Sequence, residues 1–168
     1  MKKIDPVTLA FFTAFAITIY VLETLIPKPL PFLKLGLANV VVLLLLWKEN
    51  HLAAFIVIIS KSILGGIFTA TLISPMTLIS LGASLSAFTA MFLAIKLKSG
   101  LSLPGTSILG ATIHNLAQLA IVNWLLLHSN AAMKLLPLML ILGLVTGLIT
   151  GYLATILSQQ TIIKKYLD

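Results

Sequence analysis

Long apolar segments alternate with short polar breaks along the whole chain. The segments occupy residues 6–25, 35–47, 52–73, 76–97, 106–127 and 132–157. Lipid offers the backbone no hydrogen-bond partner, so apolar segments of this kind are expected to be helices that satisfy their own N–H and C=O groups. The pattern predicts an all-α integral membrane protein with six transmembrane helices, forming a single domain over residues 1–168.

The break between the first two segments is unusually polar and rigid. Residues 26–34 contain Pro27, Pro29 and Pro31, and proline both fixes φ and removes a backbone donor. The second segment has only about 13 residues, fewer than the ~20 that a spanning helix needs. Short or interrupted segments mark binding sites in transporters. We therefore expect the 26–34 loop to dip into the membrane and to cover a binding site.

Composition narrows the possible classes of protein. The 168 residues are 60% hydrophobic and 9% charged, which leaves no room for a soluble catalytic domain beside the apolar segments. Cysteine is absent, so disulfides and thiolate metal sites are excluded. The net charge of +7 comes from lysines, most of which flank apolar segments. Membrane topology and anionic lipid headgroups explain these lysines better than nucleic acid does.

The distribution of lysines also predicts an orientation. One side of the membrane would carry Lys2, Lys3, Lys48, Lys96, Lys98, Lys164 and Lys165. The other side would carry Lys28, Lys34 and Lys134. Because basic residues are enriched in cytoplasmic loops, both termini are expected in the cytoplasm and the 26–34 loop outside. We expect a multi-pass protein of a prokaryotic cell membrane.

Small residues recur at helix-packing spacing on two of the expected helices. Gly143, Gly147 and Gly151 form a double GxxxG pattern in the last segment. Gly82, Ser86 and Ala90 have the same spacing in the fourth. Small residues let helix backbones approach each other closely in lipid. Packing within the molecule is the favoured interpretation.

Lys61 lies near the middle of the third segment, far from either end. A lysine at that depth costs about 3 kcal/mol on insertion scales and is poorly placed to reach the interface. It is therefore expected to face the interior of the bundle. A functional anion site and a structural pair with Glu23 are the two interpretations, and we favour the first.

The fifth segment contains Gly110-Ala-Thr-Ile-His114-Asn115-Leu-Ala-Gln118. At 100° per residue, His114, Asn115 and Gln118 occupy about one third of the helix circumference. Together with Lys61 they would form a cationic, hydrogen-bonding pocket suited to phosphate or carboxylate. The alternative is that these residues only link helices by hydrogen bonds.

The ends of the proline-rich stretch supply the other candidate ligand contacts. Glu23 precedes it, and Lys34 and Asn39 follow its prolines. Lys34 could contact a ligand or extend to the headgroups, and we favour the ligand; Lys28 is expected to face solvent. The predicted substrate-binding residues are Glu23, Lys34, Asn39, Lys61, His114, Asn115 and Gln118.

An enzymatic function is not expected. The only aspartates, Asp5 and Asp168, lie at the ends of the chain, whereas prenyl synthases and phosphotransferases hold magnesium with aspartate clusters. Walker, zinc-ligand and GxSxG patterns are absent. We expect no catalytic residue, no metal and no cofactor.

Three motifs together resemble one known family. They are Ile26-Pro27-x-Pro29-x-Pro31, Lys34-Leu-Gly-Leu-Ala-Asn39, and the Gly110–Gln118 pattern above. The chain resembles the small membrane proteins called heptaprenyl diphosphate synthase component I, or the Gx transporter family, over nearly its whole length. That family is similar to the S components of energy-coupling factor (ECF) transporters, six-helix proteins that bind a vitamin or precursor from outside.

The resemblance implies partners and a substrate class. S components dock on a coupling subunit, which works with ATPases, through an AxxxA pattern on the first helix, and Ala10 and Ala14 have this spacing. The family name points to an isoprenoid diphosphate or a related phosphorylated precursor. The family often has arginine near the position of Lys61, and lysine keeps the charge but lacks the bidentate geometry that suits phosphate.

Three functional interpretations remain open. The first is the binding and translocation subunit of an ECF-type importer for a small anionic substrate. The second is a non-catalytic membrane subunit of a polyprenyl diphosphate synthase. The third is a solitary carrier, coupled to protons through Glu23 or His114.

Overall fold

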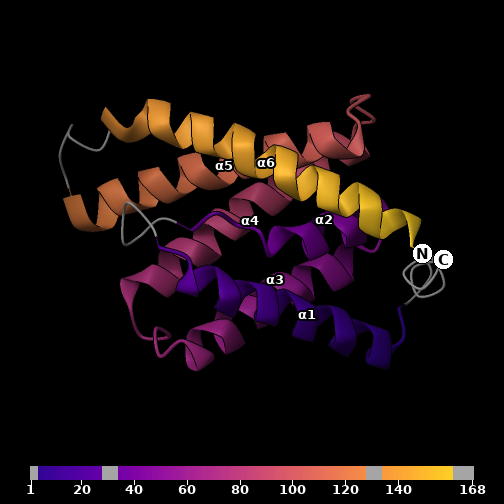
Figure 1. Ribbon diagram of the computed structural model, residues 1–168, viewed down its shortest axis with the longest axis horizontal. Helices are drawn as coiled ribbons and strands as arrows, with labels where there is room; N and C mark the ends of the chain where they lie inside the picture. Colours follow the sequence, from indigo (N-terminus) through magenta and orange to yellow (C-terminus); the bar gives the residue numbers. More distant parts are fainter. Residues whose placement is uncertain (1–3, 28–33, 128–133, 161–168) are drawn as a thin grey trace.

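The chain forms a bundle of helices in a computed structural model, which describes residues 4–27, 34–127 and 134–160. Figure 1 shows the arrangement of the helices. In chain order the elements are α1 (Pro6–Leu25), α2 (Asn39–Trp47), α3 (His51–Phe68), α4 (Pro75–Lys96), α5 (Leu103–Val122), the π-helical turn η1 (Asn123–Leu127) and α6 (Leu136–Gln159). Within the described ranges there is no strand. The predicted all-α class is confirmed.

Five of the described helices are long and apolar enough to cross a membrane, and α2 is the exception. It has nine residues, which corresponds to about 14 Å of helix. The hydrocarbon core of a bilayer is ~30 Å thick. The structure therefore supports five of the six predicted spans, and the second apolar segment forms a short interior helix.

Local backbone conformation explains where the helices differ from the predicted bounds. α3 ends at Phe68, short of the predicted residue 73, because Ala70 has a φ of 54°. Left-handed residues of this kind close a helix by directing N–H groups back to its last carbonyls. α5 begins ahead of the predicted residue 106 because the Ser102 side chain accepts the Gly105 N–H. The predicted start of the last helix, residue 132, lies outside the described residues.

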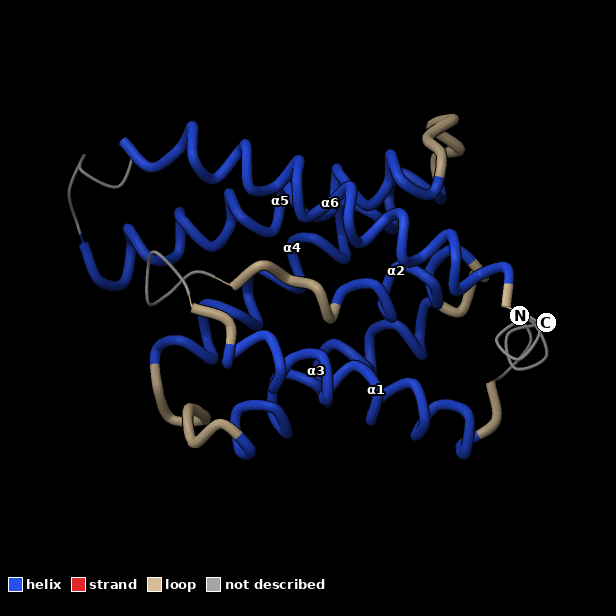
Figure 2. Tube along the Cα trace, in the orientation of Figure 1, coloured by secondary structure: helices blue, strands red, loops and turns tan. Residues whose placement is uncertain are grey.

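Helix α2 lies in the centre of the bundle. It contacts α1, α3, α4, α5 and α6, and Figure 2 shows the loop before it running inward between the longer helices. Every residue from Val40 to Leu46 is at most 2% exposed. A helix that is apolar on all sides can lie either in a protein core or in lipid. The five surrounding helices, rather than the Val-Leu run alone, make α2 the core of the protein.

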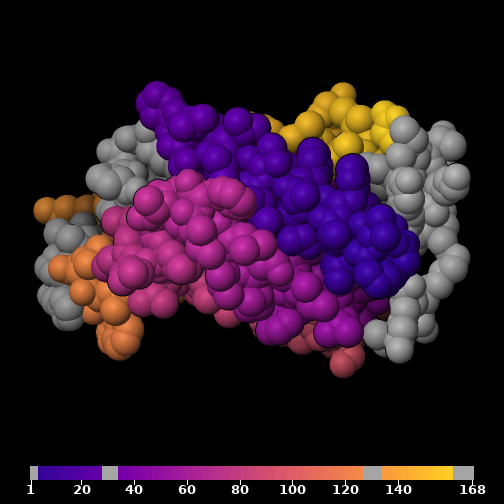
Figure 3. All heavy atoms as spheres, turned by 90° about the horizontal axis from the view of Figure 1, so that it is seen from below, coloured from indigo at the N-terminus to yellow at the C-terminus, as the bar shows by residue number. Residues whose placement is uncertain are grey.

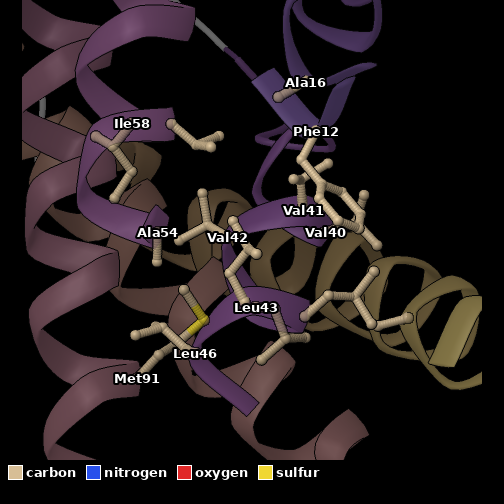
Figure 4. Close-up of a cluster of buried hydrophobic side chains, with 14 of the residues drawn as sticks. Phe12, Ala16, Val40, Val41, Val42, Leu43, Leu46, Ala54, Ile58 and Met91 are labelled. Atoms are coloured by element: carbon tan, nitrogen blue, oxygen red, sulfur yellow. The ribbon is translucent and has the colours of Figure 1, made fainter. Parts of the chain in front are cut away.

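The main hydrophobic cluster surrounds this central helix. Figure 4 shows Phe12 and Ala16 of α1 packing on one side of α2, and Met91 of α4 reaching it from another. Ala54 and Ile58 contribute from α3. The cluster therefore joins the N-terminal helices to α4 through α2.

Helices α5 and α6 pack through the glycines that the sequence singled out. A Cβ on Gly147 would lie 2.6 Å from the Cα of Ile108, and one on Gly151 would lie 2.7 Å from the Cα of Pro104. The corresponding distance from Gly143 to the Cα of Thr112 is 2.8 Å. Backbone thus lies against backbone along three successive turns, and the prediction of packing within the molecule is confirmed for this pattern.

Helix α1 presents one face to its neighbours and another to the surroundings. Figure 3 shows α1, in indigo, lying alongside the purple-to-magenta α3. Its exposed residues include Ala10 and Ala14, flanked by Phe11 and Phe15. The small residues predicted to dock a partner are therefore on the outer face of the bundle.

Candidate functional site

A small polar cavity lies beside the entry of the chain into α2. It has a volume of about 10 Å³, on the scale of a single water molecule. We call it the Lys61 cavity. Its lining residues come from α1, α3, α4, α5 and the 34–38 segment, and they are Tyr20, Glu23, Lys34, Gly36, Ala38, Lys61, Ser80, Ser84 and His114. Four predicted site residues, from four separate parts of the chain, thus meet at one place.

Lys61 is 2% exposed and reaches from α3 to the start of α2. Its Nζ donates to the Oδ1 of Asn39 at 2.5 Å. A neutral amide oxygen satisfies one of the three ammonium donors but supplies no opposite charge. Asn39 and Lys61, which are both predicted site residues, therefore contact each other directly.

Glu23 holds the turn that starts α2. Its Oε1 accepts the Gly36 N–H at 2.9 Å, and its Oε2 accepts the Leu37 N–H at 3.1 Å. Both oxygens of this buried carboxylate are thus engaged by the backbone. A carboxylate at the beginning of a helix is also favoured by the helix dipole. Glu23 accordingly positions the loop as well as lining the cavity.

Gly36 brings the loop against the fifth helix. Its φ is +76°, a left-handed value that L side chains rarely adopt. A Cβ at this position would lie 3.1 Å from Nδ2 of Asn39 and 3.3 Å from Cδ2 of His114. The close approach of loop, α2 and α5 therefore depends on glycine.

Lys34 connects the loop to α1 and α5. Its Nζ donates to the hydroxyl of Tyr20 and lies 3.7 Å from the centre of that ring. Its backbone N–H donates to Oε1 of Gln118 at 3.4 Å. Lys34 therefore points into the bundle, as the ligand-contact interpretation predicts, and Gln118 is linked to the site through the loop.

Several buried polar atoms near the cavity have no hydrogen-bond partner. His114 is 1% exposed and neither ring nitrogen is bonded, although the backbone of Ala83 lies near the ring. The Nε2 of Gln118 and the Oγ of Ser62 are also unpartnered, but neither residue lines the cavity. Unsatisfied buried polar groups are uncommon and costly, so the ring nitrogens of His114 are available to a polar ligand.

Asn115 does not line the Lys61 cavity, although its Oδ1 is likewise buried and unpartnered. Its Nδ2 donates to the backbone carbonyl of Met139 at 3.1 Å, which ties α5 to α6. The geometry of Asn115 matches the alternative in which a polar residue links two helices. Lys28, also part of the proline-rich stretch, lies outside the described residues, as do Pro29 and Pro31.

Sequence reasoning did not assign five of the lining residues to the site: Tyr20, Gly36, Ala38, Ser80 and Ser84. Tyr20 lies three residues before Glu23, so both share one face of α1. Ser80 and Ser84 are four residues apart on α4 and are both buried. These spacings were available in the sequence, but a hydroxyl in a membrane helix is common enough to attract little attention. The role of Gly36 required knowledge of its φ.

The electrostatics of the cavity favour an anion. Two ammonium groups, on Lys34 and Lys61, share it with the single carboxylate of Glu23. The carboxylate is already bonded to two backbone N–H groups. Buried charges require an opposite partner or several hydrogen bonds. A phosphate or carboxylate ligand would supply both.

The fold and this site together define a class. The protein is a small all-helical bundle with five helices apolar enough to cross a membrane and a charged, hydrogen-bonding site at its centre. These features fit a multi-pass membrane protein. Within that class, the chain belongs to the heptaprenyl diphosphate synthase component I family, whose model matches residues 12–157. No curated protein and no solved structure matches the chain.

The family match covers every predicted substrate-binding residue and most of α1 to α6. It confirms the resemblance to this family. The further likeness to ECF S components stays a prediction.

Proposed function

We propose that this protein is the substrate-binding membrane component of an ECF-type importer and has no catalytic activity of its own. It takes a small anionic ligand from the outer side of the membrane at the Lys61 cavity. Lys61 and Lys34 supply positive charge, and His114 and Gln118 supply hydrogen bonds. Release to the inside follows the association with the coupling subunit and its ATPases.

One observation carries this proposal: two lysines and an unpartnered histidine surround one buried cavity that contains a single carboxylate. Charged residues within membrane helices are expensive and are mostly retained for function. A site that served only to join helices would be better served by apolar side chains of similar volume. The excess of positive charge favours an anion over a cation as ligand.

The family description supports an isoprenoid diphosphate or a related precursor as the substrate class. A diphosphate would engage the ammonium groups. Because the empty cavity has the volume of a single water molecule, binding would require the surrounding helices and the 34–38 segment to move apart. Because lysine binds phosphate as a point charge rather than through a bidentate fork, the headgroup would be held less rigidly than by arginine.

Binding to purified protein tests the site. The probes are geranyl diphosphate and inorganic diphosphate, with native mass spectrometry and equilibrium binding as readouts. We expect Lys61→Ala to lower affinity by about tenfold or more, since a lost charge-assisted hydrogen bond costs about 1.5–3 kcal/mol. The matched control is Lys134→Ala, because Lys134 is exposed and far from the cavity in sequence. Equal affinity in both variants would show that the ligand site is elsewhere.

Substitutions on the outer face of α1 test the docking of the proposed partner subunit. Ala10 and Ala14 are exposed between larger apolar residues, and small residues let a partner helix approach closely. Widening both to leucine should prevent co-purification with ATPase subunits. Val145→Leu, on the exposed face of α6, should leave co-purification unchanged. Co-purification that survives the double substitution would contradict docking through α1.

The family description also favours a second function, that of a non-catalytic membrane subunit associated with a polyprenyl diphosphate synthase. In this case a soluble prenyl synthase subunit would appear in the same pull-down in place of ATPases. Uptake of geranyl diphosphate into vesicles that contain this protein alone would instead indicate a solitary carrier.

A further inference from the structure

Two more cavities lie along the central helix. One, the middle cavity, has a volume of about 10 Å³ and is lined by Gly36, Asn39, Leu43, Met91, Ser107, Gly110, Ala111 and Thr150. The other, the Lys98 cavity, has a volume of about 290 Å³ and is lined by Trp47, Ala94, Ile95, Lys98, Ser99, Gly100, Leu101 and Thr106. The larger volume is close to the lower end of the range of ~300–1,000 Å³ that ligand sites occupy.

The three cavities form a series from one end of α2 to the other. The Lys61 cavity and the middle cavity share Gly36, just before α2 begins. The middle cavity then contacts Leu43, and the Lys98 cavity contacts Trp47 one helical turn later. On α5 the adjacent residues Ser107 and Thr106 line the two in turn. The series thus runs between α2 and α5, from the buried lysine toward the opposite end of the bundle.

Several residues that line these cavities carry hydroxyl groups, although the interior of the protein is mostly apolar. Ser107 and Thr150 line the middle cavity, and Thr106 lines the Lys98 cavity, each at most 5% exposed. Lys98 is the one charged residue among those lining the Lys98 cavity. The Thr106 hydroxyl already donates to the Ser102 carbonyl and the Thr150 hydroxyl to the Thr146 carbonyl. The preference for anions over cations therefore comes from the lysine at the mouth.

Met91 belongs to the middle cavity and lies on the part of α4 that continues toward the Lys98 cavity. It is 2% exposed and lines the middle cavity, while Ala94 and Ile95, one turn later on α4, line the Lys98 cavity. Its sulfur lies 2.5 Å from the position of a Cβ on Gly110, so it fills the space that this glycine leaves. Figure 4 shows its side chain directed at α2 near Leu43 and Leu46. Methionine is unbranched and flexible, so it can leave such a position by rotating.

We propose that the Lys98 cavity is a second binding site for a small anion, joined to the Lys61 cavity through the middle cavity when Met91 rotates away. The ligand leaves the protein at this end. The identity of the anion rests on the proposed function, whereas the route itself does not. A lipid headgroup is the competing occupant of the Lys98 cavity, and it would need no connection to Lys61.

Thiol labelling tests the route directly, because the chain has no cysteine of its own. Thr106→Cys and Ser107→Cys are each placed in the full-length protein in sealed membrane vesicles of known orientation. The probes are an anionic sulfonatoethyl and a cationic trimethylammonioethyl methanethiosulfonate. The control is Ala87→Cys, which is buried in the hydrophobic cluster and lines none of the three cavities.

From the membrane face at which α4 ends, we expect the anionic reagent to label Thr106→Cys about tenfold faster than Ala87→Cys, since an accessible thiol near a cation is the more reactive one. Lys98→Gln should lower the ratio of anionic to cationic labelling rates at Thr106→Cys severalfold. Ser107→Cys should be labelled slowly from this face, and Met91→Ala should raise its rate. An unchanged rate in Met91→Ala would overturn the connection between the cavities.

Met139→Ala separates a gate from a general loosening of the fold. Met139 is another fully buried methionine, on α6, and lines none of the cavities. Faster labelling of Ser107→Cys in Met91→Ala but not in Met139→Ala supports the gate, and equal acceleration in both contradicts it. Labelling at Thr106→Cys that Lys98→Gln leaves unchanged would overturn the anion site.

The two proposals can fail separately. Labelling needs no substrate, so the expected labelling pattern with diphosphate binding unaffected by Lys61→Ala would refute the proposed function alone. Loss of diphosphate binding in Lys61→Ala without Met91-dependent labelling would refute the route alone. If Thr106→Cys is protected by an anionic phospholipid and Ser107→Cys never reacts, the cavity holds a headgroup and the route is wrong.

Discussion

The α5–α6 interface and the Lys61 cavity are both built around small residues, yet they differ in how well their atoms are satisfied. At the interface, Gly143, Gly147 and Gly151 place one backbone against another. At the cavity, Gly36 also allows close approach, and Gly65 lies against the ring of Tyr20, which lines the cavity. There, however, both ring nitrogens of His114 lack partners, whereas between α5 and α6 Asn115 bonds through its Nδ2 and leaves its Oδ1 unpartnered.

This difference indicates what each region is for. Continuous backbone contact gives stability in lipid, where helix association depends on close packing rather than on a hydrophobic drive. Unsatisfied polar atoms reduce stability, and proteins commonly keep them where function requires it. The interface therefore behaves as a fixed frame, and under the proposed function the cavity is the part that would change on ligand binding.

The largest effect on stability should come from adding a methyl group at the α5–α6 interface. Gly147→Ala would put a Cβ 2.6 Å from the Cα of Ile108, so the two backbones must separate. Overpacking of this kind costs about 1–3 kcal/mol. We expect a clear loss of folded protein in thermal denaturation in detergent.

The matched control is Gly82→Ala. Its Cβ would lie 2.6 Å from Cδ1 of Ile121, the end of a side chain that can move. Alanine also favours a helix over glycine by about 1 kcal/mol, so this variant should be as stable as the original protein or more so. Equal destabilisation by the two alanines would refute the description of the interface as a rigid frame.

A methyl group at the edge of the cavity should have a smaller effect on stability and a distinct effect on binding. Gly65→Ala would place a Cβ 2.4 Å from Cδ1 of Tyr20, and the ring must move. Since Tyr20 accepts the hydrogen bond from Lys34, the loop should shift with it. We expect about 1–2 kcal/mol of lost stability and weaker binding of geranyl diphosphate. If stability falls but ligand binding is unaltered, Tyr20 contributes to helix packing and not to the ligand site.

Removing the buried charge should stabilise the empty protein. Lys61→Met keeps the volume but eliminates an ammonium group that is 2% exposed. The gain from the lost desolvation penalty exceeds the loss of one hydrogen bond to Asn39, giving a net rise of about 1 kcal/mol. Calorimetry in detergent without ligand measures it. A large decrease instead would mean that Lys61 is structural.

The smallest effect should arise outside both regions, at the start of α1. Asp5 accepts the Thr8 N–H at 2.9 Å and the Thr8 hydroxyl at 2.5 Å. The hydroxyl and, to a lesser extent, the N–H lower the pKa of Asp5 below its ordinary value of 3.8. A lowered pKa means that the ionised carboxylate stabilises the fold at neutral pH. That stability is lost as the pH falls through the folded pKa.

We therefore expect Asp5→Ala to lower the melting temperature slightly at pH 7, with a difference from the original protein that narrows below pH 3.8. Asp5→Asn should retain most of the cap at pH 7, because asparagine is an equally good N-cap. If the difference in melting temperature between Asp5→Ala and the original protein widens on acidification, the pKa of Asp5 is not lowered by folding.

Sequence reasoning recovered much of the fold and part of the site. The bounds of α1 agree with the apolar segment, and Lys61, His114 and Gln118 are buried as their cost in lipid requires. Asn115 lies next to His114 on the same polar face, yet it bonds to Met139 on α6. Adjacent residues of a helix point about 100° apart, and only the neighbouring helices determine which of them reaches a cavity.

The sequence by itself determined the helical class and the presence of a buried cation. Hydropathy and the free-energy cost of placing a charge in lipid both follow from local sequence. It also determined which face of α6 packs within the molecule, since GxxxG spacing selects one face of a helix, whereas the partner helix α5 came from the tertiary structure. Only the tertiary structure decided that the second apolar segment is a nine-residue interior helix. Its residues are apolar on every side, so its length and position depend on the five helices that surround it and on Glu23, which holds the turn at its beginning.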